Sequence, residues 1–268
     1  MRSESNLLVR RPWRRRLLKK LFLPLFFKLI DGFMAIGKLN REYYEHYGAS
    51  KDKLYLAPYA VDNEWFFAQK DLYLPQKQKL KEELGIPPEG KVILYAAKFL
   101  KRKRPMDLIR AFERLNLPDV FLVMVGDGEE RAACEDYVKT RKLQGVYFVG
   151  FKNQSELPKF YAIADVFVLP SEDEPWGLVL NEAMCFGLPV IATDQVGAAY
   201  DLIRHGENGF VYPVGDIESL SAYLERILKD DELRAKMGKV SLDIIGKWGF
   251  AENIEAFLEA IEGNSREG

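Results

Sequence analysis

Two glutamates bracket the start of a predicted helix, and they are the clearest indication of chemistry in the sequence. Glu174 lies in the turn that follows the apolar run 165–170, and Glu182 lies within the helix that follows Gly177. In open α/β sheets, ligands bind beside such helix N-termini, whose free N–H groups favour phosphate. Because carboxylates repel phosphate, we expect these two side chains to bind hydroxyl groups on another part of the same ligand.

Each glutamate also has an explanation that needs no ligand. The helix dipole favours an acid such as Glu174 at a helix start, and Glu182 can lie on a solvated helix face. Against the second explanation, Ala183, Met184 and Cys185 make this helix apolar nearly all round. Such a helix is buried, and a buried carboxylate needs a partner.

A cluster of cations follows the predicted strand 91–97. Lys98, Lys101, Arg102, Lys103 and Arg104 precede a helix that is predicted to begin at residue 105. The side-chain charges and the helix N–H groups would act together on a pyrophosphate. A solvated basic loop is the alternative, but a position at the end of a strand favours phosphate binding.

Two further strand ends give weaker indications. Gly126 and Gly128 let a ligand approach the backbone closely, although a turn with a charged helix cap explains them equally well. After the predicted strand 146–149, Gly150 and Phe151 leave a backbone edge that a planar base could contact.

The elements that must position these residues alternate regularly from residue 91. Strands are predicted at 91–97, 120–126, 146–149, 166–169, 189–193 and 210–212, and helices at 105–115, 129–142, 154–163, after 177, and at 198–204. Three C-terminal helices are predicted at 217–228, 231–245 and 250–261. This alternation predicts an α/β fold with a doubly wound, Rossmann-like parallel sheet.

The residues before this region predict the tail end of another sheet domain. They read as a strand at 31–37, a helix at 40–47 and a strand at 53–62. We therefore divide the chain into an N-terminal remnant (1–60), a Rossmann-like ligand-binding domain (61–250) and a C-terminal helix (251–268).

Composition excludes several classes of function. The chain has 268 residues and a formal net charge of −1, so nothing in it indicates a nucleic-acid partner. Two cysteines, Cys134 and Cys185, fall in predicted helices and indicate a reducing, cytoplasmic compartment without a disulfide. His46 and His205 adjoin no Cys/His cluster, so no metal is expected.

Residues 10–28 depart from the neutral balance, because Arg and Lys alternate there with Leu and Phe. Such a segment can lie peripherally in a membrane interface, here the inner face of a cytoplasmic membrane. The alternative is a helix whose apolar face packs on a domain now absent or on another part of the fold. The cations are Arg10, Arg11, Arg14, Arg15, Arg16, Lys19, Lys20 and Lys28.

The segment 171–184, with Glu174 and Glu182, resembles the Glu-x7-Glu signature of glycosyltransferase family 4. The segment 97–103 is similar to the family's diphosphate element, with alanine in place of glycine and Lys98 in place of arginine. The segments 125–128, 149–151, 164–171 and 205–210 also follow the family's order. The resemblance covers about residues 91–228 and implies a retaining hexosyltransferase of the GT-B fold, which uses a nucleotide-sugar donor and no metal.

The resemblance also implies roles for individual residues. Lys98 and Lys103 would bind the donor diphosphate, and Glu174 would bind the hydroxyls of the transferred sugar. Glu182 would bind the ribose. Backbone N–H groups of Gly177, Leu178 and Val179 would lie near phosphate and sugar, and Gly128 and Phe151 would border the nucleotide.

The main departure from the family is at the N-terminus, since residues 1–60 resemble only the end of the acceptor-binding domain. We therefore expect a truncated enzyme, or one whose other half is a partner polypeptide. A non-catalytic module that binds nucleotide sugars or a partner is the alternative.

Overall fold

The computed structural model describes residues 1–8, 12–115 and 117–265, and its centre is a six-stranded sheet. The strands are β3 (Lys91–Ala96), β4 (Val120–Val125), β5 (Val146–Gly150), β6 (Val166–Leu169), β7 (Val190–Thr193) and β8 (Gly209–Tyr212). Their order is β5–β4–β3–β6–β7–β8, and every neighbouring pair is parallel. The chain thus winds outward from β3 in one direction and from β6 in the other, so the order reverses between these two strands.

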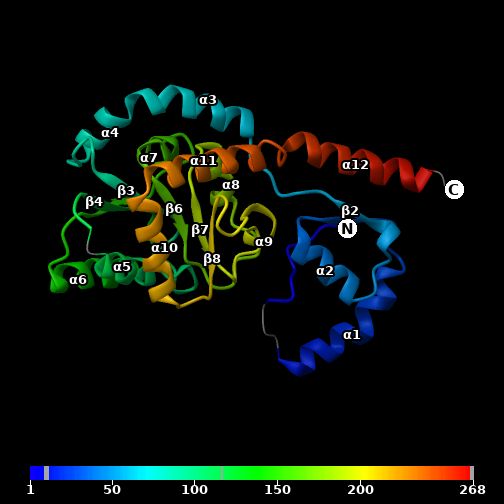
Figure 1. The fold of residues 1–268 in the computed structure, drawn as a ribbon. Helices are drawn as coiled ribbons and strands as arrows, with labels where there is room; N and C mark the ends of the chain where they lie inside the picture. Colours follow the sequence, from blue (N-terminus) through cyan, green and yellow to red (C-terminus); the bar gives the residue numbers. More distant parts are fainter. Residues whose placement is uncertain (9–11, 116, 266–268) are drawn as a thin grey trace.

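Helices cover both faces of the sheet, which confirms the predicted doubly wound α/β fold (Figure 1). Alternate residues of β3 explain the two layers. Val92 and Leu94 pack in one cluster with α7 (Leu157–Ile163) and α8 (Leu178–Cys185). Ile93 and Tyr95 pack on the opposite face with α5 (Pro105–Arg114) and α10 (Ile217–Lys229). The remaining helices of this region are α6 (Arg131–Arg141), α9 (Ala199–Leu202) and α11 (Asp231–Ile245).

A second, two-stranded sheet lies apart from the first (Figure 1). It pairs β1 (Phe33–Ala35) in parallel with β2 (Leu54–Leu56), and α2 (Lys38–His46) connects the two strands. A small aromatic core joins α1 (Trp13–Phe27) to this sheet through Phe27, Phe33 and Tyr44.

The N-terminal strands are shorter than the sequence predicts, and two helices lie where it predicts no element. β2 ends at Leu56, well before the expected end at residue 62, and Pro58 has no N–H to extend the pairing. The unpredicted helices are α3 (Asn63–Tyr73) and α4 (Lys77–Glu83). Asp62 caps α3 by accepting a hydrogen bond from the Trp65 N–H at 2.9 Å.

The C-terminal helix α12 (Phe250–Ser265) runs back beside β2 (Figure 1). The Asn253 side-chain amide donates to the carbonyl of Pro58, and the Arg2 guanidinium lies over the Phe257 ring. The division of the chain at residues 60 and 250 stays a prediction.

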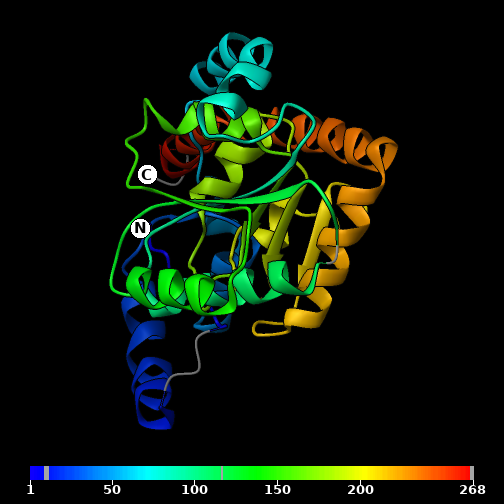
Figure 2. The same cartoon turned by 90° about the vertical axis from the view of Figure 1, so that its left-hand side faces the viewer.

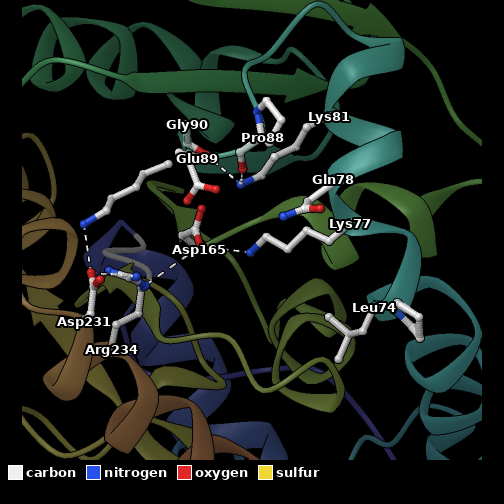
Figure 3. Close-up of a pocket in the computed structure, with 12 residues that line it drawn as sticks. Leu74, Lys77, Gln78, Lys81, Pro88, Glu89, Gly90, Asp165, Asp231 and Arg234 are labelled. Carbon is white, nitrogen blue, oxygen red and sulfur yellow. Dashed lines mark hydrogen bonds and ion pairs between the residues drawn. The ribbon is translucent and has the colours of Figure 1, made fainter.

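A hollow of about 410 Å³ lies at the amino ends of β3 and β6, where charged side chains converge (Figure 3). Asp165 accepts from the Lys77 ammonium at 2.9 Å and from the Val92 N–H at 2.8 Å. Arg234 pairs with Asp231 at 2.8 Å. The bonds among these lining residues connect α4, β3, the start of β6 and α11. They lie at the end of the sheet opposite the candidate site.

Both cysteines are buried free thiols, and burial raises the pKa of each to about 12. No helix in the described part of the chain has the length and apolar character that crossing a membrane requires.

Candidate functional site

The reversal of strand order brings the loops after β3 and β6 together at the carboxyl ends of the strands. Ligands of open α/β sheets bind at such a point. The Glu172 N–H donates to the Arg102 carbonyl at 2.7 Å. The Arg104 guanidinium pairs with the Glu172 carboxylate at 3.0 Å. The basic loop and the acidic turn of the sequence therefore face each other.

Two predicted site residues meet directly at this point. The Lys103 ammonium forms an ion pair with the Glu174 carboxylate, and their side chains are only 12% and 11% exposed. Arg102 approaches the same carboxylate at 3.5 Å. A carboxylate thus lies beside two cations at the mouth of the sheet, an arrangement that can bind hydroxyls and phosphate side by side.

The backbone around Glu174 is fixed by the segment after β7. The Glu174 N–H donates to the Gln195 carbonyl at 3.1 Å, and its carbonyl accepts from the Gly197 N–H at 2.9 Å. Gly177 then adopts a φ of 100°, which favours glycine, and α8 begins at Leu178. The N–H groups of Leu178 and Val179 precede the first internal hydrogen bond of the helix, so they are available to an anion.

The glycines after β4 hold the basic loop in place. The Phe99 N–H donates to the Asp127 carbonyl at 2.9 Å, and the Phe99 carbonyl accepts from the Glu130 N–H at 2.9 Å. A Cβ atom on Gly128 would lie 2.5 Å from the Phe99 carbonyl oxygen, and Gly128 has a φ of 150°. The atom that lies closest to Gly128 is therefore the carbonyl oxygen of Phe99, a part of the chain's own backbone.

Glu182 is largely buried in α8, and it does have a partner. The Tyr161 hydroxyl, which is fully buried on α7, donates to the Glu182 carboxylate at 2.7 Å. Burial raises the pKa of Glu182 to about 7, although the Tyr161 hydrogen bond opposes the shift. A carboxylate that is so poorly solvated can accept hydrogen bonds from ligand hydroxyls at neutral pH.

The other predicted site residues are more exposed. Lys98 has an exposed side chain, and among the described residues it has no acidic partner. Phe151 follows Gly150 at the end of β5, and its side chain is 71% exposed. Within the described part of the chain, neither side chain forms a hydrogen bond or an ion pair with Lys103 or Glu174. Their roles stay predictions.

A set of aromatic and polar residues that sequence reasoning missed joins this turn to the N-terminal part. Trp176 stacks on Trp248, with ring centroids 5.8 Å apart, and donates to Asn181 at 3.0 Å. Asn181 and Trp248 both donate to the Tyr59 carbonyl. Trp176 is two residues after Glu174, but the sequence does not indicate that the Trp176 ring stacks on Trp248.

The end of β1 also reaches this region. A Cβ atom on Gly37 would lie 2.5 Å from both the Trp176 ring and the Asp201 carboxylate. Asp201 accepts from the Lys38 N–H at 3.0 Å, and burial raises the pKa of its carboxyl to about 6. Asp201 lies in the short helix α9, and nothing in the sequence around it indicates that it belongs to the candidate site.

The groups that could hold a ligand here are cations, amides and two carboxylates. Residues 1–8, 12–115 and 117–265 contain no group of three His, Cys, Asp or Glu side chains placed to bind a metal ion. The expectation that no metal is needed stays a prediction.

Comparison with known proteins agrees with this arrangement. A family model described as "Glycosyl transferases group 1" matches residues 76–242. N-acetyl-alpha-D-glucosaminyl L-malate synthase of Bacillus anthracis is 32% identical over 73% of this chain and 51% of its own length. D-inositol 3-phosphate glycosyltransferase of Corynebacterium aurimucosum is 30% identical over 83% of this chain and 56% of its own length.

The fold also matches a solved GT-B enzyme. HepE of Anabaena, solved in complex with UDP and glucose, superposes with a TM-score of 0.77 at 20% identity, over 97% of this chain and 70% of its own. The chain spans about half the length of the curated relatives it matches. The family model covers the strands and loops that build the candidate site, and the chain belongs to the group 1 glycosyl transferases.

Proposed function

We propose that this chain supplies the donor-binding half of a retaining hexosyltransferase of family 4. It would transfer a sugar from a nucleotide-diphosphate sugar to an acceptor hydroxyl. The observation that carries the proposal is the ion pair between Lys103 and Glu174, which lies where the strand order reverses, beside the start of α8. UDP in the structure of HepE supports a nucleotide-sugar donor.

The donor binds with its parts matched to the charges of the site. Lys98, Lys103 and the amides of Gly177, Leu178 and Val179 bind the diphosphate. Glu174 accepts hydrogen bonds from the hydroxyls of the transferred sugar.

The nucleoside half binds farther along α8 and across the neighbouring strand ends. Glu182 accepts from the ribose hydroxyls, and Gly128 and Phe151 border the base. Glu174 is already paired with Lys103, so a sugar hydroxyl and a phosphate oxygen would approach these two partners together.

Catalysis consists mainly of stabilising charge on the leaving diphosphate. As the bond from the anomeric carbon to the phosphate oxygen breaks, negative charge grows on that oxygen, and the two lysines and the helix amides stabilise it. The acceptor attacks from the face that the diphosphate leaves, which retains the configuration at the anomeric carbon. No carboxylate nucleophile and no metal are required on this path.

The acceptor side needs more protein than the donor side. The sheet of the N-terminal part has only two strands among the described residues, β1 and β2, and the chain spans about half the length of its curated relatives. We propose that a further acceptor-side segment or a partner polypeptide completes the enzyme. Two buried, unpaired cysteines support a cytoplasmic protein.

Turnover tests the proposal against a module that only binds nucleotide sugars. The chain is incubated with UDP-glucose and with L-malate or inositol 3-phosphate, the acceptors named for two relatives. NMR of the product's anomeric proton should show the same α configuration as in the donor. A β-linked product would contradict retention. Binding of UDP-glucose without turnover is expected both of a binding module and of a donor half without its acceptor-side segment or partner, and turnover after that part is added would separate the two.

A further inference from the structure

Helix α1 projects away from the six-stranded body (Figures 1 and 2). Among its residues Trp13–Phe27 only Phe27 is buried. Large apolar side chains of the helix and of Leu29 just beyond it are 47% to 78% exposed: Trp13, Leu17, Leu18, Leu21, Phe22, Leu25, Phe26 and Leu29. A helix on the surface of a water-soluble domain normally turns such residues inward.

The spacing of these residues gives the helix a defined outer face. Leu17, Leu21 and Leu25 recur every fourth residue, and Leu18 and Phe22 lie beside them on the helix surface. Leu23, Phe27 and the following Ile30 pack instead on the small aromatic core of the N-terminal part. One face of the helix therefore packs on the N-terminal part, and the other, more apolar face is exposed.

The charges on this helix have one sign. Residues 5–30 include no Asp or Glu, and Arg14, Arg15, Arg16, Lys19, Lys20 and Lys28 lie in or next to α1. In the described part of the chain none of these cations has an acidic partner, and Lys19 donates to the Tyr43 hydroxyl at 2.8 Å. Arg10 and Arg11 of the same segment lie outside the described residues.

The apolar surface continues past the end of the helix. Leu29 and Ile30 line a hollow of about 340 Å³ together with Met34 of β1 and Phe257 of α12. This hollow is lined largely by apolar residues, and Leu29, which is 78% exposed, is one of them.

We propose that the outer face of α1, with Leu29, docks on an anionic lipid bilayer. Apolar side chains next to unpaired cations suit the interface of such a membrane, where leucine and aromatic side chains enter the acyl boundary and cations reach lipid phosphates. A protein partner fits this face less well, because protein interfaces are depleted in lysine, and Lys20 and Lys28 lie among these leucines without an acidic partner in the described part of the chain. The proposal is independent of glycosyl transfer, since it uses no residue of the donor site.

Flotation of the full chain with lipid vesicles tests this. We expect it to bind vesicles of phosphatidylcholine mixed with phosphatidylglycerol, and to bind phosphatidylcholine alone or at high salt far more weakly. Arg15→Glu/Lys20→Glu should lower the partition coefficient about 30-fold or more, since each basic residue near an anionic surface contributes about 1 kcal/mol. Lys139→Glu/Lys236→Glu is the matched control, because it makes the same charge change on exposed positions of α6 and α11.

A second variant and a local probe show which face is used. Leu21→Glu/Phe22→Glu should abolish binding while the far-UV spectrum is retained, because both side chains are exposed in the free protein. Trp13 is 69% exposed, so its fluorescence should shift to the blue on anionic vesicles, and Trp13→Phe should remove that shift.

Three results would overturn the proposal. The first is equal binding to both kinds of vesicle, or none. The second is an equal loss of binding in the control variant. The third is a dimer in sedimentation that Leu21→Glu/Phe22→Glu dissociates while no vesicle binding occurs, because a second copy would then occupy the face.

Discussion

Replacing Glu182 with glutamine should stabilise the protein and weaken donor binding at the same time. Burial raises the pKa of this carboxyl from 4.5 to about 7. Because its folded-state pKa is raised, the charged form costs stability as the pH rises from about 4.5 to about 7. That cost is about 3 kcal/mol at pH 8 and about 1 kcal/mol or less at pH 5. Glutamine avoids it, and its carbonyl oxygen still accepts from Tyr161.

The free energy of unfolding of Glu182→Gln and of the wild type, measured in denaturant at pH 5 and pH 8, gives the two differences directly. Glu83→Gln is the control, because this glutamate on α4 is exposed and its replacement removes a charge without relieving burial. We expect Glu182→Gln to gain about 3 kcal/mol at pH 8 and about 1 kcal/mol or less at pH 5, and the control to change little at either pH.

Ionisation of Glu182 should favour donor binding, although it lowers the stability of the fold. If the ionised carboxylate accepts hydrogen bonds from the ribose, UDP-glucose binds more tightly as the pH rises through about 7, with release of a proton. Glu182→Gln should lose this pH dependence and weaken binding about tenfold or more. A variant with unchanged affinity, or with equal stability differences at pH 5 and pH 8, would refute the reasoning.

Three other changes probe separate parts of the molecule. Gly128→Ala should cost about 2 kcal/mol and weaken donor binding, whereas Gly85→Ala, with positive φ but open space around its Cβ, should cost less and leave binding unchanged; equal costs in denaturant would contradict this. Lys103→Gln should weaken UDP-glucose binding about tenfold in calorimetry and lower the melting temperature, because the buried Glu174 carboxylate loses its ion-pair partner; undiminished affinity would count against its phosphate role. Asp165→Asn should destabilise the protein by about 3 kcal/mol, because it leaves Lys77 without its carboxylate, and should not change donor affinity; a loss of affinity would mean that the two ends of the sheet are coupled.

The alternation of strands and helices from residue 91 was enough to predict the main sheet, because each buried strand is a short apolar run between turns. The order of the strands was not readable in this way. It is this order, with β3 beside β6, that brings Lys103 to Glu174 across 71 residues of chain. Sequence reasoning predicted both residues at strand ends without predicting their ion pair.

Burial of Glu182 was predicted from its apolar neighbours, but its partner was not. Tyr161 lies 21 residues earlier on another helix, and only the packing of α7 on α8 brings the two side chains together. Helices α3 and α4 were missed because polar and apolar residues are mixed in their sequences and because they pack on α7 and α8, which lie far along the chain. For Gly128 the sequence left close approach of a ligand and a simple turn equally open, and it did not indicate that the Phe99 carbonyl lies against this glycine.

The central claim is that the loops after β3 and β6 hold a nucleotide-diphosphate sugar, and calorimetry tests it most directly. UDP-, GDP- and ADP-sugars are titrated into the wild type and into Lys103→Gln/Glu174→Gln, which replaces both partners of the ion pair. We predict that one of these donors binds the wild type and that the double variant binds it far more weakly. No binding of any of the three at millimolar concentration, or equal binding to the double variant, would contradict the claim.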